Sequence, residues 1–266
     1  MLSPLLKIAI EASIDAGKEI LKIYNTDFSV EVKTDESPLT LADKNANHVI
    51  NSFLENTKIP IISEENKQTD YSERKDWDNC WIVDPLDGTK EFVKRNGEFT
   101  VNIALVENGV PKMGVIYVPV TKELYYAEGL KAYKSYPVES NDFDFILNNA
   151  KPLRPASLSE PIKIVGSRSH LNDDTKTYIS EIENTNQVEI VSKGSSLKFC
   201  LVAEGNAHIY PRFAPTMEWD TGAGQIIVEE SGGKVISQKN GRPMEYNKEN
   251  LLNPYFIAYR KGASEG

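Results

Sequence analysis

Apolar residues recur at helical spacing in the first part of the chain. Ser3 and Pro4 are typical of a helix start, and apolar positions at intervals of three and four then predict an amphipathic helix. A second helix is expected over residues 40–56, where apolar side chains again share one face. The charged stretch 29–39 between the two helices is predicted to be a strand edge or a loop.

From residue 59 the apolar positions fall into short runs, which is the pattern of strands. Asn108-Gly109 and Pro119-Val120-Thr121 separate some of these runs in the manner of turns. The runs cover residues 59–63, 80–84, 99–106, 113–120 and 123–128. Two helices followed by a meander of strands predict an α+β arrangement for the first half of the chain.

The second half follows a polar, proline-containing stretch at residues 136–160, which we interpret as a domain boundary. Strands are expected at 162–166, 188–192, 208–212, 234–238 and 255–260, and helices at 173–184, 195–205 and 219–233. Alternation of strands and helices indicates layered α/β packing. The prediction is therefore an α/β protein with an α+β metal-binding subdomain at 1–155 and an α/β nucleotide-contacting subdomain at 156–266.

Charge and composition limit the function classes. Acidic residues outnumber basic ones by 39 to 30 among 266 residues, a net charge of −9. This balance argues against a nucleic-acid polymer or an anionic membrane as the partner. It does not exclude an anionic ligand, because bound metal cations can make the local charge of an acidic site positive. No run approaches the ~18 apolar residues of a spanning helix, and the start lacks the apolar stretch of a signal peptide. Contact with the inner face of the cell membrane stays open, because the first helix is amphipathic but not notably basic.

The two cysteines, Cys80 and Cys200, both lie in apolar surroundings. Two cysteines make no disulfide framework, and their separation does not match a zinc site. We expect buried, unreactive thiols in a protein of the reducing cytoplasm.

Four acidic positions carry the candidate chemistry. Glu64 follows one apolar run, Asp84 and Asp87 flank Pro85 directly after another, and Asp220 follows a tryptophan. Hard cations such as magnesium prefer oxygen ligands, and a turn of this kind can also offer a backbone carbonyl, here that of Leu86. Taken singly, each position has an ordinary alternative: a turn former, a solvated loop acid, or an acid at a helix start.

Three neighbouring positions add to this cluster. Gly88 permits a backbone cradle for phosphate, and the Thr89 hydroxyl can orient water or phosphate. Asp43 either bonds the Thr89 hydroxyl and helps to activate water, or completes a capping box with Thr40. The chain contains no phosphate-binding P-loop, no dinucleotide-binding glycine motif after a strand and no nucleophile elbow.

The ordered combination of these motifs resembles the lithium-sensitive, magnesium-dependent phosphomonoesterases of the inositol monophosphatase and fructose-1,6-bisphosphatase superfamily. The motifs SPLTLAD, IISEEN, WIVDPLDGTKEF and EWDTGAGQ occur in the order of that superfamily and span nearly the whole chain. The segments DGTKEFVKRNGEFTVNIALVENG, GSRSH and KGSSLKFCLVAEGNAHIYPR look like those of its CysQ-type 3′(2′),5′-bisphosphate nucleotidases. Gly222 departs from the usual alanine, a local helix penalty of ~1 kcal/mol.

The resemblance implies a layered αβαβα sandwich and a set of site residues. It implies that two or three magnesium ions are held by Glu64, Asp84, the Leu86 carbonyl, Asp87 and Asp220. It implies that Glu64 and Thr89, the latter oriented by Asp43, position the attacking water. The substrate contacts that it implies are Glu64, Leu86, Asp87, Gly88, Thr89, His170, Ser195, Lys198, Arg212 and Asp220.

The activity implied is hydrolysis of 3′-phosphoadenosine 5′-phosphate to AMP and phosphate, with the sulfated nucleotide losing the same phosphate, in sulfur assimilation and nucleotide recycling. The protein is expected to be a cytoplasmic monomer or homodimer. An inositol monophosphatase or a sugar bisphosphatase is the alternative enzyme, and a metal-dependent sensor without turnover is the alternative from another class.

Overall fold

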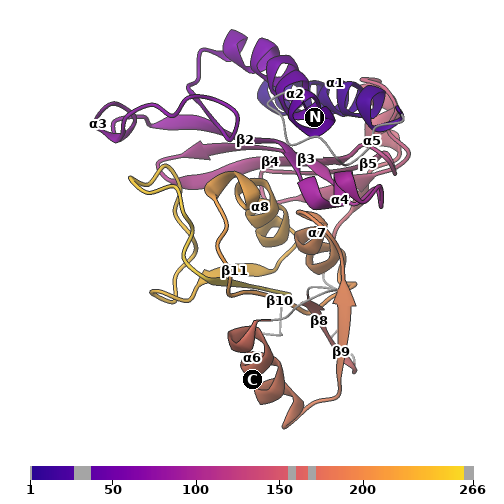
Figure 1. The fold of residues 1–266 in the computed structure, drawn as a ribbon, viewed down its shortest axis with the longest axis vertical. Helices are drawn as coiled ribbons and strands as arrows, with labels where there is room; N and C mark the ends of the chain where they lie inside the picture. Colours follow the sequence, from indigo (N-terminus) through magenta and orange to yellow (C-terminus); the bar gives the residue numbers. More distant parts are fainter. Residues whose placement is uncertain (1, 27–36, 155–159, 167–171, 261–266) are drawn as a thin grey trace.

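Helices and sheets alternate in five layers in the computed structural model (Figure 1). The structure describes residues 2–26, 37–154, 160–166 and 172–260. The helical layers, from the top of Figure 1, contain first α1 (Pro4–Tyr24) and α2 (Pro38–Leu54), then α7 (Leu197–Glu204) and α8 (Gly222–Glu230), then α6 (Asp173–Glu183). A seven-stranded sheet and a five-stranded sheet separate these layers. The predicted α/β sandwich is confirmed.

The larger sheet has its strands in sequence order, and its only parallel pair is β1 with β2. Its strands are β1 (Ile61–Ser63), β2 (Asn79–Asp87), β3 (Thr100–Glu107), β4 (Val110–Val118), β5 (Glu123–Glu128), β6 (Ala132–Ser135) and β7 (Lys151–Pro152). The first five are the predicted runs. The sixth and seventh, too short to show a period, were not predicted.

The smaller sheet has the order β11-β12-β10-β8-β9. Its strands are β8 (Ile162–Gly166), β9 (Val188–Ser192), β10 (Ile209–Arg212), β11 (Lys234–Ser237) and β12 (Phe256–Tyr259). All five were predicted to within two residues. The division into two subdomains near residue 155 stays a prediction.

Short helical segments complete the described chain. They are η1 (Glu55–Thr57), α3 (Tyr71–Arg74), α4 (Thr89–Val93), α5 (Phe143–Asn148) and η2 (Glu218–Asp220). The stretch 136–160, which shows no clear period in the sequence, contains α5 and β7, two elements that were not predicted. The helix predicted from residue 219 is a 3₁₀ turn followed by α8, and Gly222 is the first residue of α8 rather than an interior one.

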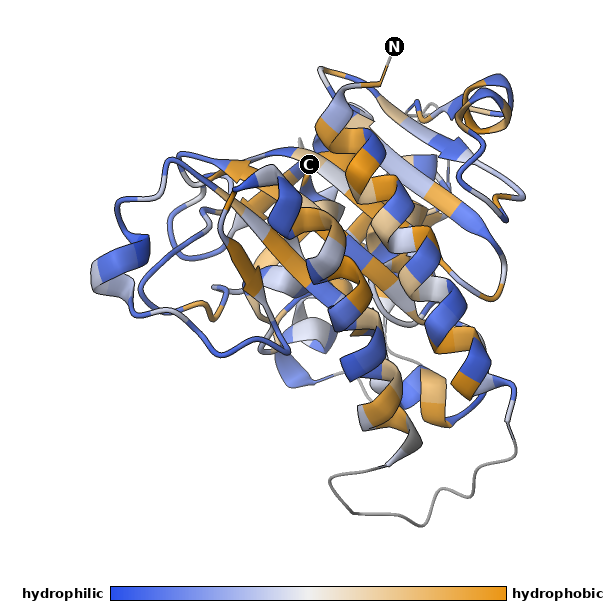
Figure 2. Ribbon diagram, turned by 90° about the horizontal axis from the view of Figure 1, so that it is seen from above, coloured by the Kyte–Doolittle hydropathy of each residue, from blue (hydrophilic) through white to orange (hydrophobic). Residues whose placement is uncertain are grey.

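The two N-terminal helices begin at serine caps. Ser3 accepts a hydrogen bond from the backbone N–H of Leu6 at 3.1 Å, as predicted. Ser37 likewise accepts from the N–H of Thr40 at 3.2 Å, so α2 begins before Thr40. The capping-box alternative for Asp43 is therefore wrong. Figure 2 shows the apolar and polar residues of these helices from above. Most of the expected strand edge or loop at 29–39 lies outside the described residues.

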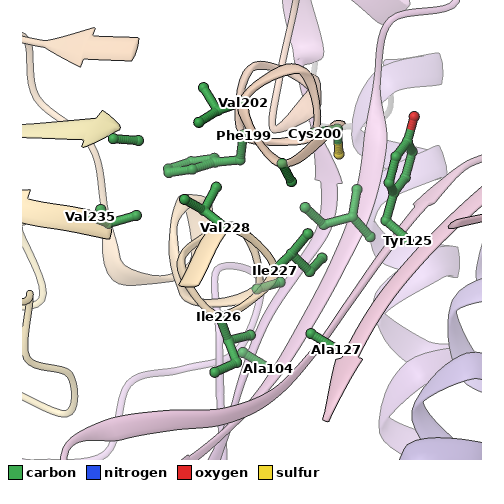
Figure 3. Packing of buried hydrophobic residues seen from close by; sticks show 14 of the residues in the cluster. Ala104, Tyr125, Ala127, Phe199, Cys200, Val202, Ile226, Ile227, Val228 and Val235 are labelled. Carbon is green, nitrogen blue, oxygen red and sulfur yellow. The ribbon is translucent and has the colours of Figure 1, made fainter. Parts of the chain in front are cut away.

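Strand β3 is apolar on both faces because both faces are covered. Val101, Ile103 and Leu105 pack against the layer of α1 and α2. Ala104 and Val106 belong to the core on the opposite face, which α7 and α8 complete. Figure 3 shows this second core, where side chains of α8 lie between the larger sheet and α7. A strand buried on both faces reads as a continuous apolar run, which explains the sequence pattern.

Cys80 and Cys200 are buried and unpaired, as predicted. Burial raises the pKa of the Cys80 thiol to about 12, which makes it unreactive near neutral pH. Among the described residues, none of the helices is both long enough and apolar enough to cross a membrane.

Candidate active site

The acidic residues meet at one edge of the larger sheet. Strands β1 and β2 run parallel, with Ser63 beside Val83, so their carboxyl ends lie together. The N–H of Glu64 donates to the carbonyl of Val83 at 3.2 Å, which places Glu64 next to Asp84. The parallel pairing therefore brings together two acids that are 20 residues apart in the sequence.

A β-bulge directs Asp84 and Asp87 to the same face. Asp84 pairs with Asn102 and Asp87 pairs with Thr100. Between these two pairs β2 therefore contains one residue more than β3. Side chains alternate along a regular strand, and residues three apart would point to opposite faces. The extra residue restores the common face. Within the bulge, the N–H of Leu86 donates to Asp84 Oδ1 at 3.1 Å.

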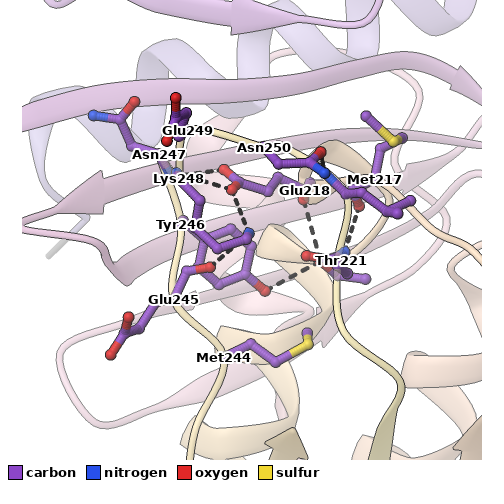
Figure 4. Close-up of polar contacts among 12 residues, drawn as sticks. Met217, Glu218, Thr221, Met244, Glu245, Tyr246, Asn247, Lys248, Glu249 and Asn250 are labelled. Atoms are coloured by element: carbon purple, nitrogen blue, oxygen red, sulfur yellow. Dashed lines mark hydrogen bonds and ion pairs between the residues drawn. The ribbon is translucent and has the colours of Figure 1, made fainter. Parts of the chain in front are cut away.

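Asp220 is delivered by a separate, firmly anchored turn, η2. Its Oδ2 accepts the N–H of Met217 at 2.8 Å. The neighbouring Glu218 is fully buried and accepts the N–H groups of Asn247 and Lys248 at 2.6 and 3.1 Å, together with the ammonium group of Lys248 (Figure 4). A buried charge with this many partners is fixed in place. The turn that presents Asp220 is therefore tied to the loop at 245–249.

Asp84, Asp87 and Asp220 each offer a carboxylate oxygen, and these oxygens all lie within 4.8 Å of one another. Burial and then Asp87 raise the pKa of Asp84 well above its ordinary value and that of Asp220 to about 6. For Glu64, burial and then Asp220 raise the pKa to about 7. For Asp84 and Glu64, burial and the neighbouring carboxylates together account for the raised pKa values. Hard oxygen donors in this arrangement fit a divalent cation such as magnesium.

Asp43 lies nearby on α2 with only 8% of its surface exposed. Burial, then Glu65 and Glu64, raise the pKa of its carboxyl group to about 8. No hydrogen bond joins the side chains of Asp43 and Thr89 in the described part of the chain. The structure thus brings Asp43 close to the acidic cluster, while its orienting role towards Thr89 stays a prediction.

A cavity of about 460 Å³ opens beside the acidic cluster. Seven of the predicted site residues line it, namely Asp87, Gly88, Thr89, Ser195, Lys198, Arg212 and Asp220. Glu64, Asp84 and Leu86 lie outside its lining, and His170 lies outside the described residues. The cavity unites residues from both halves of the chain.

Gly88 is required at the floor of this cavity for two reasons. Its φ of +96° is a conformation that residues with side chains rarely adopt. A Cβ atom at this position would lie 2.9 Å from the Cβ of Ser195. Glycine therefore lets the turn after Asp87 approach the segment before α7.

Positive side chains line another part of the cavity. The ammonium group of Lys198 donates to the carbonyl of Ser195 at 3.0 Å, and burial lowers its pKa. Arg212 donates one guanidinium N–H to the carbonyl of Pro215 at 3.1 Å, but its Nε is buried without a hydrogen-bond partner. A buried donor without a partner is unusual in a native protein and suggests an anionic ligand.

Two sets of cavity residues were not predicted. Lys90, Lys94 and Lys193 also line the cavity, and although they lie in the family-like segments, none of these exposed lysines was predicted as a site residue. Behind the cavity wall, Thr100 and Asn102 are fully buried and bonded to the serines before α7. These two polar residues interrupt an otherwise apolar strand, and that interruption is the signal that could have identified them.

Comparison with known proteins gives consistent results. The inositol monophosphatase family matches residues 1–261. The 3′(2′),5′-bisphosphate nucleotidase CysQ of Salmonella typhimurium is 42% identical over 247 residues, which are 91% of this chain and 94% of that protein. The crystal structure of CysQ from Bacteroides thetaiotaomicron, described as a bacterial member of the family, is 50% identical, covers 96% of both chains and has a TM-score of 0.90.

More distant structures share the fold alone. Inositol monophosphatase II of Staphylococcus aureus is 22% identical, with a TM-score of 0.74 over 98% of this chain and 90% of that one. The motifs, the fold and these matches agree, and the chain belongs to the inositol monophosphatase family.

Proposed function

We propose that the protein is a magnesium-dependent 3′(2′),5′-bisphosphate nucleotidase that hydrolyses 3′-phosphoadenosine 5′-phosphate to AMP and phosphate. The observation that carries the proposal is one cavity with acids at one part of its wall and Lys198 and Arg212 at another. Such a cavity suits a ligand with two anionic groups. The names of the CysQ relatives support the choice of nucleotide.

The acids would hold the cations. Asp84, Asp87 and Asp220 supply converging carboxylate oxygens, and Glu64 and the Leu86 carbonyl are the further ligands that we propose for two or three magnesium ions. When bound, divalent cations favour deprotonation of the attacking water and neutralise charge on the leaving oxygen.

The remaining residues would bind and orient the nucleotide. The backbone at Gly88 and Thr89 would receive the phosphate that is cleaved, and Glu64 and Thr89 would position water. Lys198 and Arg212 would hold the second phosphate, because their cationic donors face the cavity and the Arg212 Nε lacks a partner. His170 stays a predicted contact. Most of the catalysis would then come from positioning and charge neutralisation.

The direct test measures phosphate release from 3′-phosphoadenosine 5′-phosphate, inositol 1-phosphate and fructose 1,6-bisphosphate, each with magnesium and with a chelator. We expect the nucleotide to be the best substrate and turnover to require magnesium. Preference for inositol 1-phosphate would overturn the choice of nucleotide. Activity that is unchanged by the chelator would overturn the cation site.

The variant test uses Asp87→Asn, with the exposed Asp144→Asn on α5 as matched control. We expect turnover of Asp87→Asn to fall by at least about 100-fold, because the substitution removes one full negative charge from the cluster. The control should retain turnover, and both variants should show the circular dichroism of the folded protein. Normal phosphate release by Asp87→Asn would remove Asp87 from the cation site.

A further inference from the structure

Arg74 is a buried arginine outside the cavity. It is the last residue of α3, and only 4% of its surface is exposed. Arginine is rarely buried unless it is paired, because removing its charge from water is costly. α3 lies in the connection between β1 and β2, so Arg74 stands in the chain between Glu64 and Asp84. The Nε of Arg74 donates to the carbonyl of Thr69 at 3.2 Å, which orients the rest of the guanidinium group.

The guanidinium group of Arg74 holds one side of the loop at 245–249. Its Nη1 donates to the carbonyl of Lys248 at 2.6 Å and to Asn247 Oδ1 at 2.9 Å, and its Nη2 donates to the carbonyl of Glu249 at 2.8 Å. In return, Asn247 Nδ2 donates to the carbonyl of Arg74 at 2.7 Å. A guanidinium group only donates and a carbonyl only accepts, so these directions do not depend on any protonation state. The planar fork therefore fixes two successive carbonyl groups of the loop.

The other side of the same loop binds Glu218. The backbone N–H groups of Asn247 and Lys248 converge on the Glu218 carboxyl group at 2.6 and 3.1 Å (Figure 4). Asn247 has a φ of +56°, and a left-handed residue allows successive N–H groups to converge on one acceptor. A residue with a side chain is uncommon in this conformation, which persists where the surroundings impose it. The loop thus receives Glu218 in a conformation that needs support, and Arg74 supplies contacts for it.

Glu218 transmits the position of the loop to Asp220. Both residues belong to the 3₁₀ turn η2, in which the carbonyl of Glu218 accepts the N–H of Thr221 at 3.2 Å. The N–H of Glu218 donates to the carbonyl of Leu251 at 3.0 Å. Asp220 Oδ2 accepts the N–H of Met217, so the backbone of the turn orients this carboxyl group. A displacement of the loop therefore displaces the turn that carries Asp220.

We propose that Arg74 is a positioning residue for the cation site: it holds the loop at 247–249 in the conformation that receives Glu218, and thereby fixes Asp220. The inference deepens the proposed function and rests on it for the cation. Arg74 itself touches neither cation nor substrate, so its effect is on the affinity for magnesium. Because α3 lies in the connection between β1 and β2, the contact also links the two parts of the chain that supply the proposed ligands.

The test measures magnesium binding to the unmodified protein, Arg74→Met and Arg74→Lys by isothermal titration calorimetry, well below the unfolding temperature of each. A group that supports a metal ligand directly is worth ~10–100-fold in metal affinity. Arg74 acts one step further away, so the dissociation constant should rise roughly 5–20-fold in Arg74→Met. Arg74→Lys keeps the charge but not the planar fork, and should show a smaller rise. If Arg74→Met does not fold, Arg74→Lys carries the comparison.

The matched control is Ile14→Ala, a substitution in the core between α1 and the larger sheet. It removes buried apolar groups and should lower the thermal midpoint, as a purely structural defect does. Its magnesium dissociation constant should nevertheless stay within about 2-fold of that of the unmodified protein, a factor that corresponds to ~0.4 kcal/mol. Loss of stability alone would thus be distinguished from loss of the position of Asp220.

A second measurement needs no cation. The N–H of Met217 donates to Asp220 Oδ2 at 2.8 Å, so its hydrogen exchange in the cation-free protein reports whether Asp220 keeps its place. Weakening one hydrogen bond corresponds to roughly 3–10-fold, and exchange at Met217 should be faster by that factor in Arg74→Met than in Ile14→Ala. The same comparison applies to Arg74→Lys.

Two results of the binding experiment would overturn the inference. Unchanged magnesium affinity in the folded Arg74 variants would show that Arg74 does not position the site. An equal loss of affinity in Ile14→Ala would show that any destabilisation has this effect. If the unmodified protein binds no magnesium, the proposed function fails separately, and exchange at Met217 decides the role of Arg74. Equal exchange in the Arg74 variants and in Ile14→Ala would then refute it.

Discussion

Asp43 should make the stability of this protein depend on pH. It is a buried carboxyl group on α2 beside the acidic cluster. Burial, then Glu65 and Glu64, raise its pKa to about 8, whereas an isolated aspartate titrates near pH 3.9. The folded protein therefore holds a proton on Asp43 where the unfolded chain has already lost it. The contribution of Asp43 to folding becomes steadily less favourable as the pH rises from about 4 to about 8.

The size of this effect follows from the two pKa values. Each pH unit between them corresponds to ~1.4 kcal/mol, so the interval sets a ceiling of roughly 5–6 kcal/mol above pH 8. We expect about 2–4 kcal/mol, since buried sites behave as more polar than a dry interior. Asp43→Asn has nearly the same shape and does not ionise, so it should remove this pH-dependent penalty.

The assay is urea unfolding of the cation-free protein at pH 5, 7 and 9, compared with Asp43→Asn and with Asp144→Asn as the exposed control. At pH 5, about one unit above the ordinary pKa of an aspartate, Asp43→Asn should be more stable than the unmodified protein by only ~1–1.5 kcal/mol. At pH 9 Asp43→Asn should be the more stable by the amount above, although we expect it to lose turnover. If the free energy of unfolding changed with pH in the same way for Asp43→Asn and the unmodified protein, the reasoning would be refuted.

Three further outcomes are expected. Gly114→Ala should lower the free energy of unfolding by ~1–3 kcal/mol, because the new Cβ would lie 2.5 Å from Ile226 Cγ2 and 2.9 Å from the carbonyl oxygen of Ala223. An unchanged midpoint of urea unfolding would contradict this close packing. Glu218→Gln should lower the free energy of unfolding by ~1–3 kcal/mol, because it leaves the Lys248 ammonium group without its buried partner. The double variant Glu218→Gln/Lys248→Met removes both charges and should lose little stability by the same urea measurement. Magnesium at 100 times its dissociation constant should stabilise the protein by ~2.7 kcal/mol, measured as a shift in thermal midpoint that the chelator reverses and Asp87→Asn abolishes.

Periodicity was sufficient to predict the main layers from the sequence. Helices α1 and α2 have an apolar face, and strands covered on both faces, such as β3, are continuous apolar runs. Short elements were missed because they owe their structure to distant contacts. The four-residue α3, for example, is held by Arg74, whose guanidinium donates to the carbonyls of Lys248 and Glu249 at 2.6 and 2.8 Å. No local pattern reports such a contact.

The candidate site was predictable as a set of residues but not as a geometry. The order of the acidic motifs pointed to Asp84 and Asp87, yet the one-residue bulge that turns them to a common face depends on pairing with β3. Likewise, the sequence gives no reason to place Ser195 against Gly88, residues that are more than 100 positions apart. Distances between elements arise from packing, which a linear pattern does not contain.

Buried polar residues within apolar strands are more informative than the total charge. A net charge of −9 argues only against a nucleic-acid polymer or an anionic membrane as the partner, and the cavity carries lysine and arginine side chains at the point where an anion would bind. Thr100 and Asn102, by contrast, would each cost free energy in the middle of a covered sheet unless every donor and acceptor found a partner. They find partners in a chain that ends on Asp87 at one side and Ser195 at the other. These two residues add nothing to apolar packing, and their hydrogen bonds instead fix the segment before α7 at the cavity wall.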